Sequence, residues 1–260
     1  MSKQRILITG ATSGFGAGTA IGLAKKGHHV IAAGETWQQV TALREQADEA
    51  KVKLTTIKLD LLNPIDIEHA ALFDVDILVL NAGVQETGSL VDIPMDLVRR
   101  SFEVNVFAHL DLAQRIIPAM IKRKSGKVVW VSSQAGLYAP PFMGAYAATK
   151  HAVEALAEAM RVELAPFRIG VATINPGLFR TGYNETGAET HDQWSKLQDV
   201  HIPMPPAAPL LALQHDPQPM IDAMVDTIPD KKGPYRLMMP EDAVVETKAA
   251  QELAWTVKSS

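Results

Sequence analysis

Apolar runs and amphipathic stretches alternate along this chain. Short apolar runs predict buried strands near residues 5–9, 29–33, 53–59, 76–80, 127–132 and 168–174. Stretches with helical spacing lie between them, near 15–26, 37–50, 64–73, 95–123 and 145–165, and one more helix is predicted near 241–257. Repeated β-α units of this kind predict an α/β fold: a single Rossmann-like, doubly wound domain over residues 1–260, with a parallel sheet covered by helices on both faces.

Glycine and polar residues follow these strands. Right-handed crossovers bring the carboxyl ends of parallel strands to one edge of the sheet, where doubly wound folds bind ligands. The residues expected at that edge are Gly10, Gly34, Asp60, Asn81, Ser133 and Pro176.

The composition changes after Thr181. Residues 203–219 hold six of the sixteen prolines, which excludes a regular helix or a central strand across that stretch. A solvated loop is one interpretation of it.

Length, charge and cysteine content limit the class of protein. At 260 residues the chain can bury a sizeable core. A net charge of −4 offers no basic surface for nucleic acid, and no apolar stretch is long enough to span a membrane. The absence of cysteine excludes thiol catalysis, and with no secretory signal at the N-terminus it favours a cytoplasmic location.

The most informative motif is Tyr146-Ala147-Ala148-Thr149-Lys150. Tyr146 and Lys150 share one face of the predicted helix, and an ammonium close to a phenol favours the phenolate. Ser133, thirteen residues before Tyr146, could hydrogen-bond a carbonyl oxygen while a proton moves. The set can therefore act on an alcohol or ketone, although a Tyr and a Lys at this spacing also occur on solvated helix faces.

A glycine-rich turn joins the first predicted strand to the first helix. The segment from Gly10 to Gly16 has glycines at 10, 14 and 16. Gly10 permits a tight turn, and Gly14 and Gly16 let backbone approach a diphosphate, whose charge a helix N-terminus favours. A glycine turn without function is the alternative.

Seven motifs in order make the chain resemble the short-chain dehydrogenase/reductase family over roughly residues 3–182. They are Thr9 to Gly16, Asp60-Leu61, Asn81-Ala82-Gly83, Asn105, Ser133, Tyr146 with Lys150, and Pro176-Gly177 with Thr181.

The resemblance implies a role for each catalytic residue. Tyr146 is the general acid or base, and Lys150 lowers the pKa of Tyr146 and binds the nicotinamide ribose. Ser133 polarises the carbonyl, and Asn105 holds a proton-relaying water. Ser132 could replace Ser133, but it lacks the thirteen-residue spacing. Asn105 could instead be a polar residue facing a neighbour, and Asp60 an ordinary turn residue.

The resemblance also implies a nicotinamide dinucleotide as cofactor. Its contacts are expected from Gly10, Thr12, Ser13, Gly14, Phe15, Gly16, Gly34, Glu35, Asp60, Leu61, Asn81, Ala82, Gly83, Tyr146, Lys150, Pro176, Gly177, Phe179 and Thr181. Glu35 would repel a 2′-phosphate, and no Arg or Lys stands at the positions where NADP-dependent members often carry one. NAD is therefore favoured over NADP, with a solvent-facing Glu35 as the alternative.

In such proteins the segment after the Pro-Gly turn is a lid over the substrate, here about residues 183–220. The lid would carry the apolar residues Trp194, Ile202, Met204, Leu210, Leu211 and Leu213. Expected substrate contacts are Ser133, Gln134, Tyr146, Leu178 and Trp194, with Val84, Leu137, Phe142 and Met143 as further walls. These walls favour an apolar or aromatic secondary alcohol or ketone as the small-molecule partner.

The helices near 95–123 and 145–165 suggest a homodimer or homotetramer. Ala148, Ala152, Ala155 and Ala159 form a small-residue stripe on the second helix, although packing into the core would explain the stripe as well. The eight histidines show no metal-ligand spacing, so no metal is expected.

Two alternative functions remain at the level of sequence. A non-catalytic dinucleotide sensor on the same fold should have lost part of the Ser-Tyr-Lys set, which this chain keeps. An epimerase or dehydratase usually belongs to longer relatives.

Overall fold

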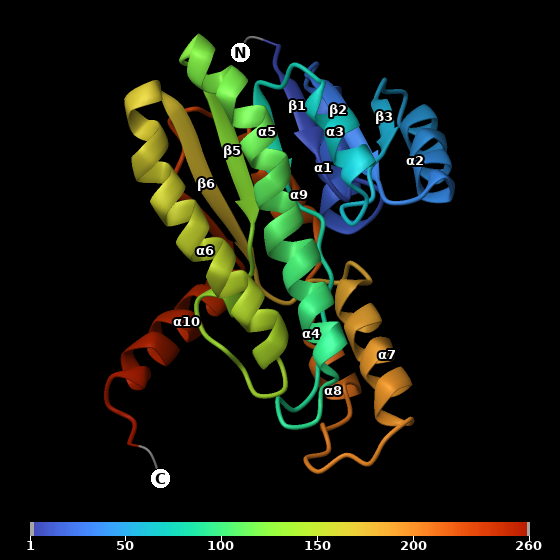
Figure 1. The fold of residues 1–260 in the computed structure, drawn as a ribbon, viewed down its shortest axis with the longest axis vertical. Coiled ribbons are helices and arrows are strands. Elements are labelled where there is room, and N and C mark those ends of the chain that lie inside the picture. Colours follow the sequence, from blue (N-terminus) through green and yellow to red (C-terminus); the bar gives the residue numbers. More distant parts are fainter. Residues whose placement is uncertain (1–2, 259–260) are drawn as a thin grey trace.

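A computed structural model describes residues 3–258. Seven strands form one parallel sheet in the order β3-β2-β1-β4-β5-β6-β7 (Figure 1). The strands are β1 Arg5–Ile8, β2 His29–Gly34, β3 Thr55–Lys58, β4 Ile77–Leu80, β5 Gly126–Val131, β6 Ile169–Pro176 and β7 Arg236–Met239. The Rossmann-like, doubly wound fold expected from the alternating pattern is confirmed.

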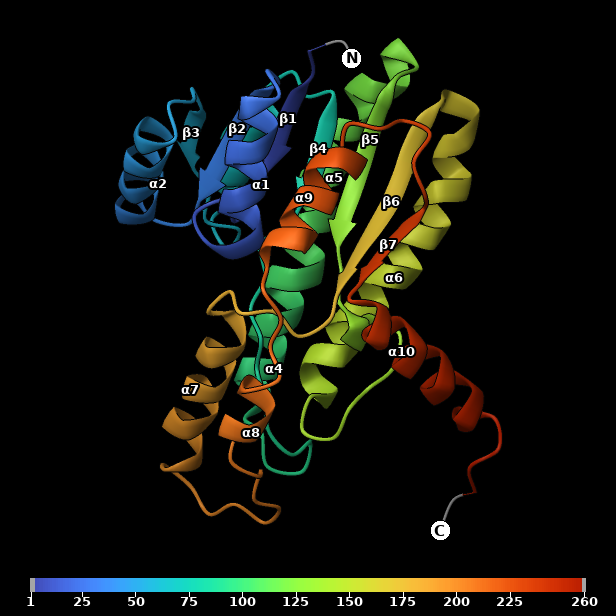
Figure 2. The ribbon, with the colours of Figure 1, turned by 180° about the vertical axis from the view of Figure 1, so that it is seen from behind.

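Helices cover both faces of the sheet. The helices of the described chain are α1 Gly14–Lys25, α2 Trp37–Glu49, α3 Pro64–Ala71, α4 Met95–Phe102, α5 Ala108–Arg123, α6 Gly144–Leu164, α7 Tyr183–Ser195, α8 Ala208–Leu211, α9 Gln218–Thr227 and α10 Glu241–Ala254. Of these, α7 and α8 lie beyond the carboxyl edge of the sheet and not on its faces (Figure 1). Figure 1 shows α5 and α6 in front of the sheet, and Figure 2 shows α1 and α9 on the opposite face. No helix of residues 3–258 is long and apolar enough to cross a bilayer.

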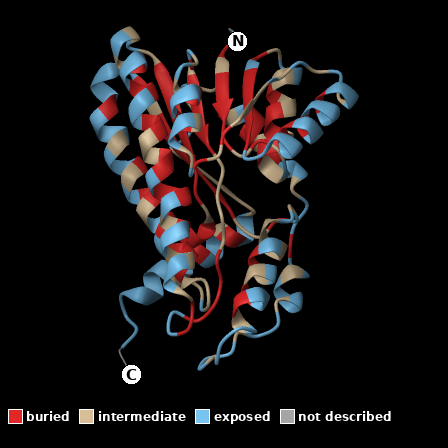
Figure 3. Ribbon diagram, turned by 45° about the vertical axis from the view of Figure 1, so that its right-hand side comes forward, coloured by how far each residue is buried: buried red, intermediate tan, exposed pale blue. Residues whose placement is uncertain are grey.

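The protein has two hydrophobic cores, one on each face of the sheet, because successive side chains of a strand point to opposite faces. In β1, Leu7 belongs to the core with α5 and α6, whereas Ile6 and Ile8 belong to the core with α1 and α9. The central strands β4 and β5 are buried on both faces, which explains why they appear as continuous apolar runs (Figure 3).

The sequence analysis gave no residue ranges for four elements, although it expected a lid of helix and loop near the C-terminus. The predicted strands omitted β7, which pairs with β6, because its four residues are only partly buried and lie between Pro234 and Pro240. The expected proline-rich loop contains the single-turn helix α8 and ends at α9, whose first turn accommodates Pro219. The first part of the expected lid is the regular helix α7.

The long helix expected near 95–123 is interrupted. Residues Glu103–Phe107 form a short π-helix between α4 and α5. Asn105 lies in this interruption, where the change of backbone register turns it toward the loop after β4.

Candidate active site

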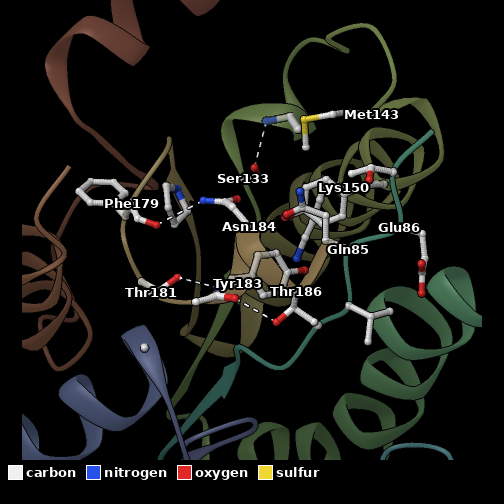
Figure 4. A pocket seen from close by; sticks show the side chains of 18 of the residues that line it. Gln85, Glu86, Ser133, Met143, Lys150, Phe179, Thr181, Tyr183, Asn184 and Thr186 are labelled. Atoms are coloured by element: carbon white, nitrogen blue, oxygen red, sulfur yellow. Dashed lines mark hydrogen bonds between the residues drawn. The ribbon is translucent and has the colours of Figure 1, made fainter. Parts of the chain in front are cut away.

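A cavity of about 1050 Å³ opens at the carboxyl edge of the sheet (Figure 4). The ends of β1, β4, β5 and β6 form its floor, and residues of α7 and α8 close it from the other side. Most residues expected at the site line it: Gly10, Thr12, Ser13, Gly14, Phe15, Gly16, Glu35, Asp60, Leu61, Asn81, Ala82, Gly83, Ser133, Gln134, Tyr146, Lys150, Pro176, Gly177, Leu178, Phe179 and Thr181.

The glycine turn forms a narrow backbone cradle at one end of the cavity. Gly10 has a φ of +61°, and a Cβ there would lie 2.7 Å from the Cα of Ala82. A Cβ on Gly16 would lie 2.2 Å from the carbonyl oxygen of Gly10. The Asn81 amide donates to the carbonyl oxygens of Thr9 and Gly10 at 2.9 and 3.0 Å, which fixes the turn.

The N-terminus of α1 opens onto this cradle. Ser13 is the N-cap residue, but its side chain makes no capping hydrogen bond. The first-turn N–H groups of α1 and the helix dipole therefore suit a negatively charged group such as a diphosphate. The cradle and the helix end together fit a dinucleotide.

Helix α6 carries Tyr146 and Lys150 into the same cavity. Tyr146 and Lys150 are 5% and 4% exposed. The Lys150 Nζ lies 5.7 Å from the centre of the Tyr146 ring and donates to the Val131 carbonyl oxygen at 3.0 Å. Ser133 caps the turn after β5, where its Oγ accepts from the Ala135 N–H at 3.1 Å and its hydroxyl faces Tyr146. Ser132 also lines the cavity, but its Oγ lies against Gly136.

Burial governs the acidity of these groups. It raises the pKa of Tyr146 above its usual 10, and hydrogen bonding from Ser133 and Tyr183 partly opposes the rise. It lowers the pKa of Lys150 to about 8, against the opposite effect of Glu154. The sequence analysis expected Lys150 to lower the Tyr146 pKa, whereas the pKa is raised here because desolvation of the buried phenol exceeds the opposing hydrogen bonds from Ser133 and Tyr183.

Asn105 lies behind the cavity wall and not in it. Its side chain accepts from the Val84 N–H at 2.8 Å and donates to the Val84 carbonyl oxygen and the Thr149 hydroxyl. The structure therefore gives the Asn105 amide the role of holding the loop after β4. These amide contacts fit the alternative expectation of a polar residue facing a neighbour, and the water-holding role of Asn105 stays a prediction.

Three other expected residues do not line the cavity. A Cβ on Gly34 would meet Thr12 at 2.5 Å, so Gly34 supports the glycine turn from behind. Trp194 is buried with Ile93 and Ala145, which places its indole in a small core under α7. Leu137 lies outside the lining as well. The sequence predicted that Trp194 would lie in apolar surroundings, but it could not show whether the indole faces the cavity or the core.

The sequence analysis missed Tyr183, which places a second phenol at the site. A Cβ built on Gly83 would lie 3.2 Å from Asn105 Oδ1, 3.3 Å from the Tyr183 hydroxyl and 3.7 Å from Lys150 Nζ. Figure 4 shows Tyr183 beside Lys150. The Tyr183 ring lies beside the Tyr146 ring, with 6.1 Å between the ring centres, and burial raises the pKa of the Tyr183 hydroxyl well above 10. Its position two residues after Thr181 was the only signal available.

Glu86 is another lining residue that sequence reasoning missed. Its side chain is 2% exposed, and its nearest cation is Arg100 at 3.5 Å. Burial raises the Glu86 pKa, and Arg100 opposes the rise. Nothing in the sequence around Glu86 marked it as buried.

Glu35 lies at the opposite end of the cavity. It is exposed, and its backbone N–H donates to the Gln39 side chain, which also completes the capping box of α2. Within the described lining the cations are Arg100 and Lys150, and neither belongs to the strand ends near Glu35. Asp60 lines the same end and also accepts from the Leu62 N–H, as a turn residue does.

The fold and the glycine cradle define a Rossmann-like domain suited to a dinucleotide. Residues 4–192 match the family model for short chain dehydrogenase. The chain therefore belongs to the short-chain dehydrogenase/reductase family, and it is an oxidoreductase of that family.

Two of the similar proteins match this chain over most of its length. An uncharacterized oxidoreductase of Myxococcus xanthus (strain DK1622) is 32% identical over 247 residues, which cover 86% of this chain and 96% of that protein. The crystal structure of a short-chain dehydrogenase from Streptomyces avermitilis matches with a TM-score of 0.81 and 29% identity, and covers 98% of this chain and 94% of that one.

A further solved structure contains a cofactor. A putative NAD(P)-dependent gluconate 5-dehydrogenase from Beutenbergia cavernae, with bound NADP at low occupancy, matches with a TM-score of 0.78 and 25% identity, and covers 94% of this chain and 98% of that one. Among residues 3–258, no group of three or more His, Asp or Glu side chains is arranged to hold a metal ion.

Proposed function

We propose that this protein interconverts a secondary alcohol and a ketone by transferring a hydride to or from a nicotinamide dinucleotide. The observation that carries the proposal is the meeting of Tyr146, Lys150 and Ser133 in one cavity that continues to the glycine cradle. The nicotinamide ring supplies or accepts the hydride when it is bound. The protein supplies the proton and the position of the substrate.

The protein groups have separate roles in this reaction. In reduction, the Tyr146 phenol gives its proton to the carbonyl oxygen as the hydride reaches the carbon, and in oxidation it takes the proton back as the phenolate. The raised pKa of Tyr146 suits the acid role. Ser133 donates a hydrogen bond to the same oxygen, and the Lys150 ammonium stabilises the phenolate. Asn105 positions the loop that includes Gly83 and Val84.

NAD is the cofactor that the chain favours in this proposal. Glu35 is an exposed carboxylate at the end of the cavity expected to hold the adenine ribose, and a carboxylate there would repel a 2′-phosphate. The NADP in the Beutenbergia cavernae protein is a property of that protein, and it makes the comparison of the two cofactors an essential measurement.

The lid and the assembly of subunits complete the proposal. Met204, Leu210, Leu211 and Leu213 contribute apolar surface to the cavity, which suits an apolar or aromatic substrate. Ala148, Ala155 and Ala159 on α6 are exposed, whereas Ala152 packs against the core, so core packing explains only one member of the small-residue stripe. We propose this face of α6 as the contact of a homodimer, for which sedimentation of the parent and of Ala155→Arg is the test.

A titration with NADH and NADPH, followed by a screen of alcohols and ketones, tests the function. Binding of a dinucleotide with turnover that depends on Tyr146 supports the proposal. Binding without turnover on any alcohol or ketone would favour the non-catalytic sensor, although the complete Ser-Tyr-Lys set argues against it.

A further inference from the structure

The wall of the cavity next to Ser133 is built partly by the C-terminal helix. Glu246 of α10 lines the cavity together with Gln134 and Tyr138. The Gln134 Nε2 donates to Glu246 Oε2 at 2.8 Å, and the Tyr138 hydroxyl donates to Glu246 Oε1 at 3.1 Å. One carboxylate of α10 thus holds two side chains of the segment that follows β5.

These contacts fix which end of the Gln134 amide faces the cavity. A carboxylate only accepts hydrogen bonds, so the NH₂ end of Gln134 must point to Glu246. The Ala243 carbonyl oxygen, at 3.4 Å from Nε2, is a second acceptor on the same side. Reversing the amide would place its oxygen against two other oxygens. The Tyr138 proton also stays in place, because burial and then Glu246 raise the Tyr138 pKa to about 12.

The opposite end of Gln134 presents an acceptor. Its Oε1 receives no hydrogen bond from the described residues and lies beside Gly177, 3.3 Å from where a Cβ on that glycine would stand. Gln134 is itself buried, so its orientation is held by packing as well as by hydrogen bonds. Ser133, the donor expected to hold the reacting oxygen, is the preceding residue on the same wall.

We propose that Gln134 is a specificity-determining residue that accepts a hydrogen bond from a donor on the substrate, and that Glu246 positions it. Because Ser133 and Gln134 are consecutive, the donor is an O–H or N–H group close to the reacting carbon. The favoured substrates are therefore α-hydroxy or α-amino ketones and the matching vicinal alcohols, with an apolar remainder under the lid. This inference rests on the proposed function, whose reaction it makes more specific.

Three ketones isolate the hydrogen bond: acetophenone, its α-hydroxy derivative and its α-methoxy derivative. The methoxy group keeps the oxygen but removes the donor, so it leaves the Gln134 acceptor unpaired. We expect the parent protein to prefer the hydroxy ketone over the methoxy ketone by about tenfold in kcat/KM, the size expected for one such hydrogen bond. Binding of each ketone to the protein saturated with cofactor, measured by calorimetry, should show the same order without requiring turnover.

Variants then assign the preference to Gln134. Gln134→Met keeps the length of the side chain but lacks the acceptor, so the two ketones should become equivalent while the Kd of the cofactor stays unchanged. Glu246→Gln replaces the carboxylate that fixes the orientation of the Gln134 amide. It should reduce the preference for the hydroxy ketone over the methoxy ketone, mainly by raising the KM of the hydroxy ketone. Glu252→Gln, an exposed carboxylate on the same helix, is the matched control and should behave as the parent.

The outcomes separate this inference from the proposed reaction. Equal use of all three ketones by the parent, binding of none of them, or an unchanged preference in Gln134→Met would each overturn the inference. A change in cofactor Kd without a change in ketone preference would assign Gln134 to the cofactor and overturn it too. Preferential binding of the hydroxy ketone without any turnover would instead support the inference and contradict the proposed oxidoreduction.

Discussion

The Trp194 indole lies directly over Gly88, so that a Cβ on Gly88 would come within 2.4 Å of Trp194 Cζ2. This contact joins the end of α7 to the loop after β4. A second connection lies nearby, where the Asp92 carboxylate accepts from the N–H groups of His201 and Ile202 at 2.9 Å each. The lid is thus anchored at its far end, while Tyr183 at its near end stands beside Lys150.

We expect Trp194→Ala to release the lid and not to reshape the substrate cavity directly. Removing a buried indole costs about 3–5 kcal/mol of stability, since a void replaces it. Hydrogen exchange across residues 183–213 should accelerate, and binding of cofactor with substrate should slow it again. Trp255→Ala is the control, since Trp255 is 91% exposed. Equal exchange in the free and bound states would show that the segment is a static surface element.

Tyr146→Phe should keep the fold and bind cofactor but lose most turnover. The phenyl ring preserves the packing, whereas general acid-base catalysis contributes roughly 10²–10⁴-fold. Steady-state rates with a good substrate, together with cofactor titration, measure both properties. Tyr235→Phe, at a tyrosine outside the cavity lining, should retain activity. More than about a tenth of the parent rate in Tyr146→Phe would contradict its role.

The charge of Lys150 should limit activity on the alkaline side. Its pKa in the folded protein is about 8, below its usual 10.5, so the ammonium is lost as the pH rises through that value. We expect kcat/KM to fall above about pH 8 in the free enzyme. Glu154 raises the Lys150 pKa, so in Glu154→Gln the alkaline fall in kcat/KM should begin at a lower pH. Glu158→Gln, on an exposed site of the same helix, should not.

Glu35→Arg should narrow or reverse the preference between the two dinucleotides. The parent should bind NADH more tightly than NADPH, because the carboxylate repels the 2′-phosphate and the described cavity has no cation at that end. Dissociation constants for both cofactors in both proteins give the answer. Equal affinities in the parent that the substitution leaves unaltered would place Glu35 away from the ribose.

Lys127 should make the free energy of unfolding depend on pH. Its buried ammonium donates to the carbonyl oxygens of Thr227 and Asp230 at 2.8 and 2.7 Å, and burial lowers its pKa from 10.5 to about 8. Between these values the unfolded chain binds more protons than the folded protein, so stability from this group rises with pH. Below about pH 8 Lys127 is charged in both the folded and the unfolded protein, and burial of its ammonium then lowers the free energy of unfolding by the full amount.

Denaturant unfolding of the parent and of Lys127→Met should show this difference. The stability of the parent relative to the variant should increase from about pH 8 to about pH 10.5. The shift at Lys150 is common to both proteins and cancels in the comparison. A difference independent of pH would mean that Lys127 titrates normally in the folded state.

The sequence by itself determined six of the seven strands and most of the residues at the carboxyl edge of the sheet. The runs that form β1, β4 and β5 are apolar because those strands are covered on both faces. A continuous apolar run of this kind can be recognised directly in the sequence. The glycine turn, Ser133, Tyr146 and Lys150 were identifiable for a similar reason. Each is tied to a strand end or to a helix turn, so local spacing places it.

Only the tertiary structure decided how distant segments share the cavity. Tyr183 and Glu246 come from α7 and α10, and their local sequences do not reveal which side chains they meet across the fold. Trp194 faces a small core and not the cavity, because the loop against which α7 packs sets the rotation of that helix. Asn105 binds the Val84 backbone because a π-helix shifts the backbone register at this position. Contacts between segments far apart in the sequence decided these positions, and no local sequence pattern predicts such contacts.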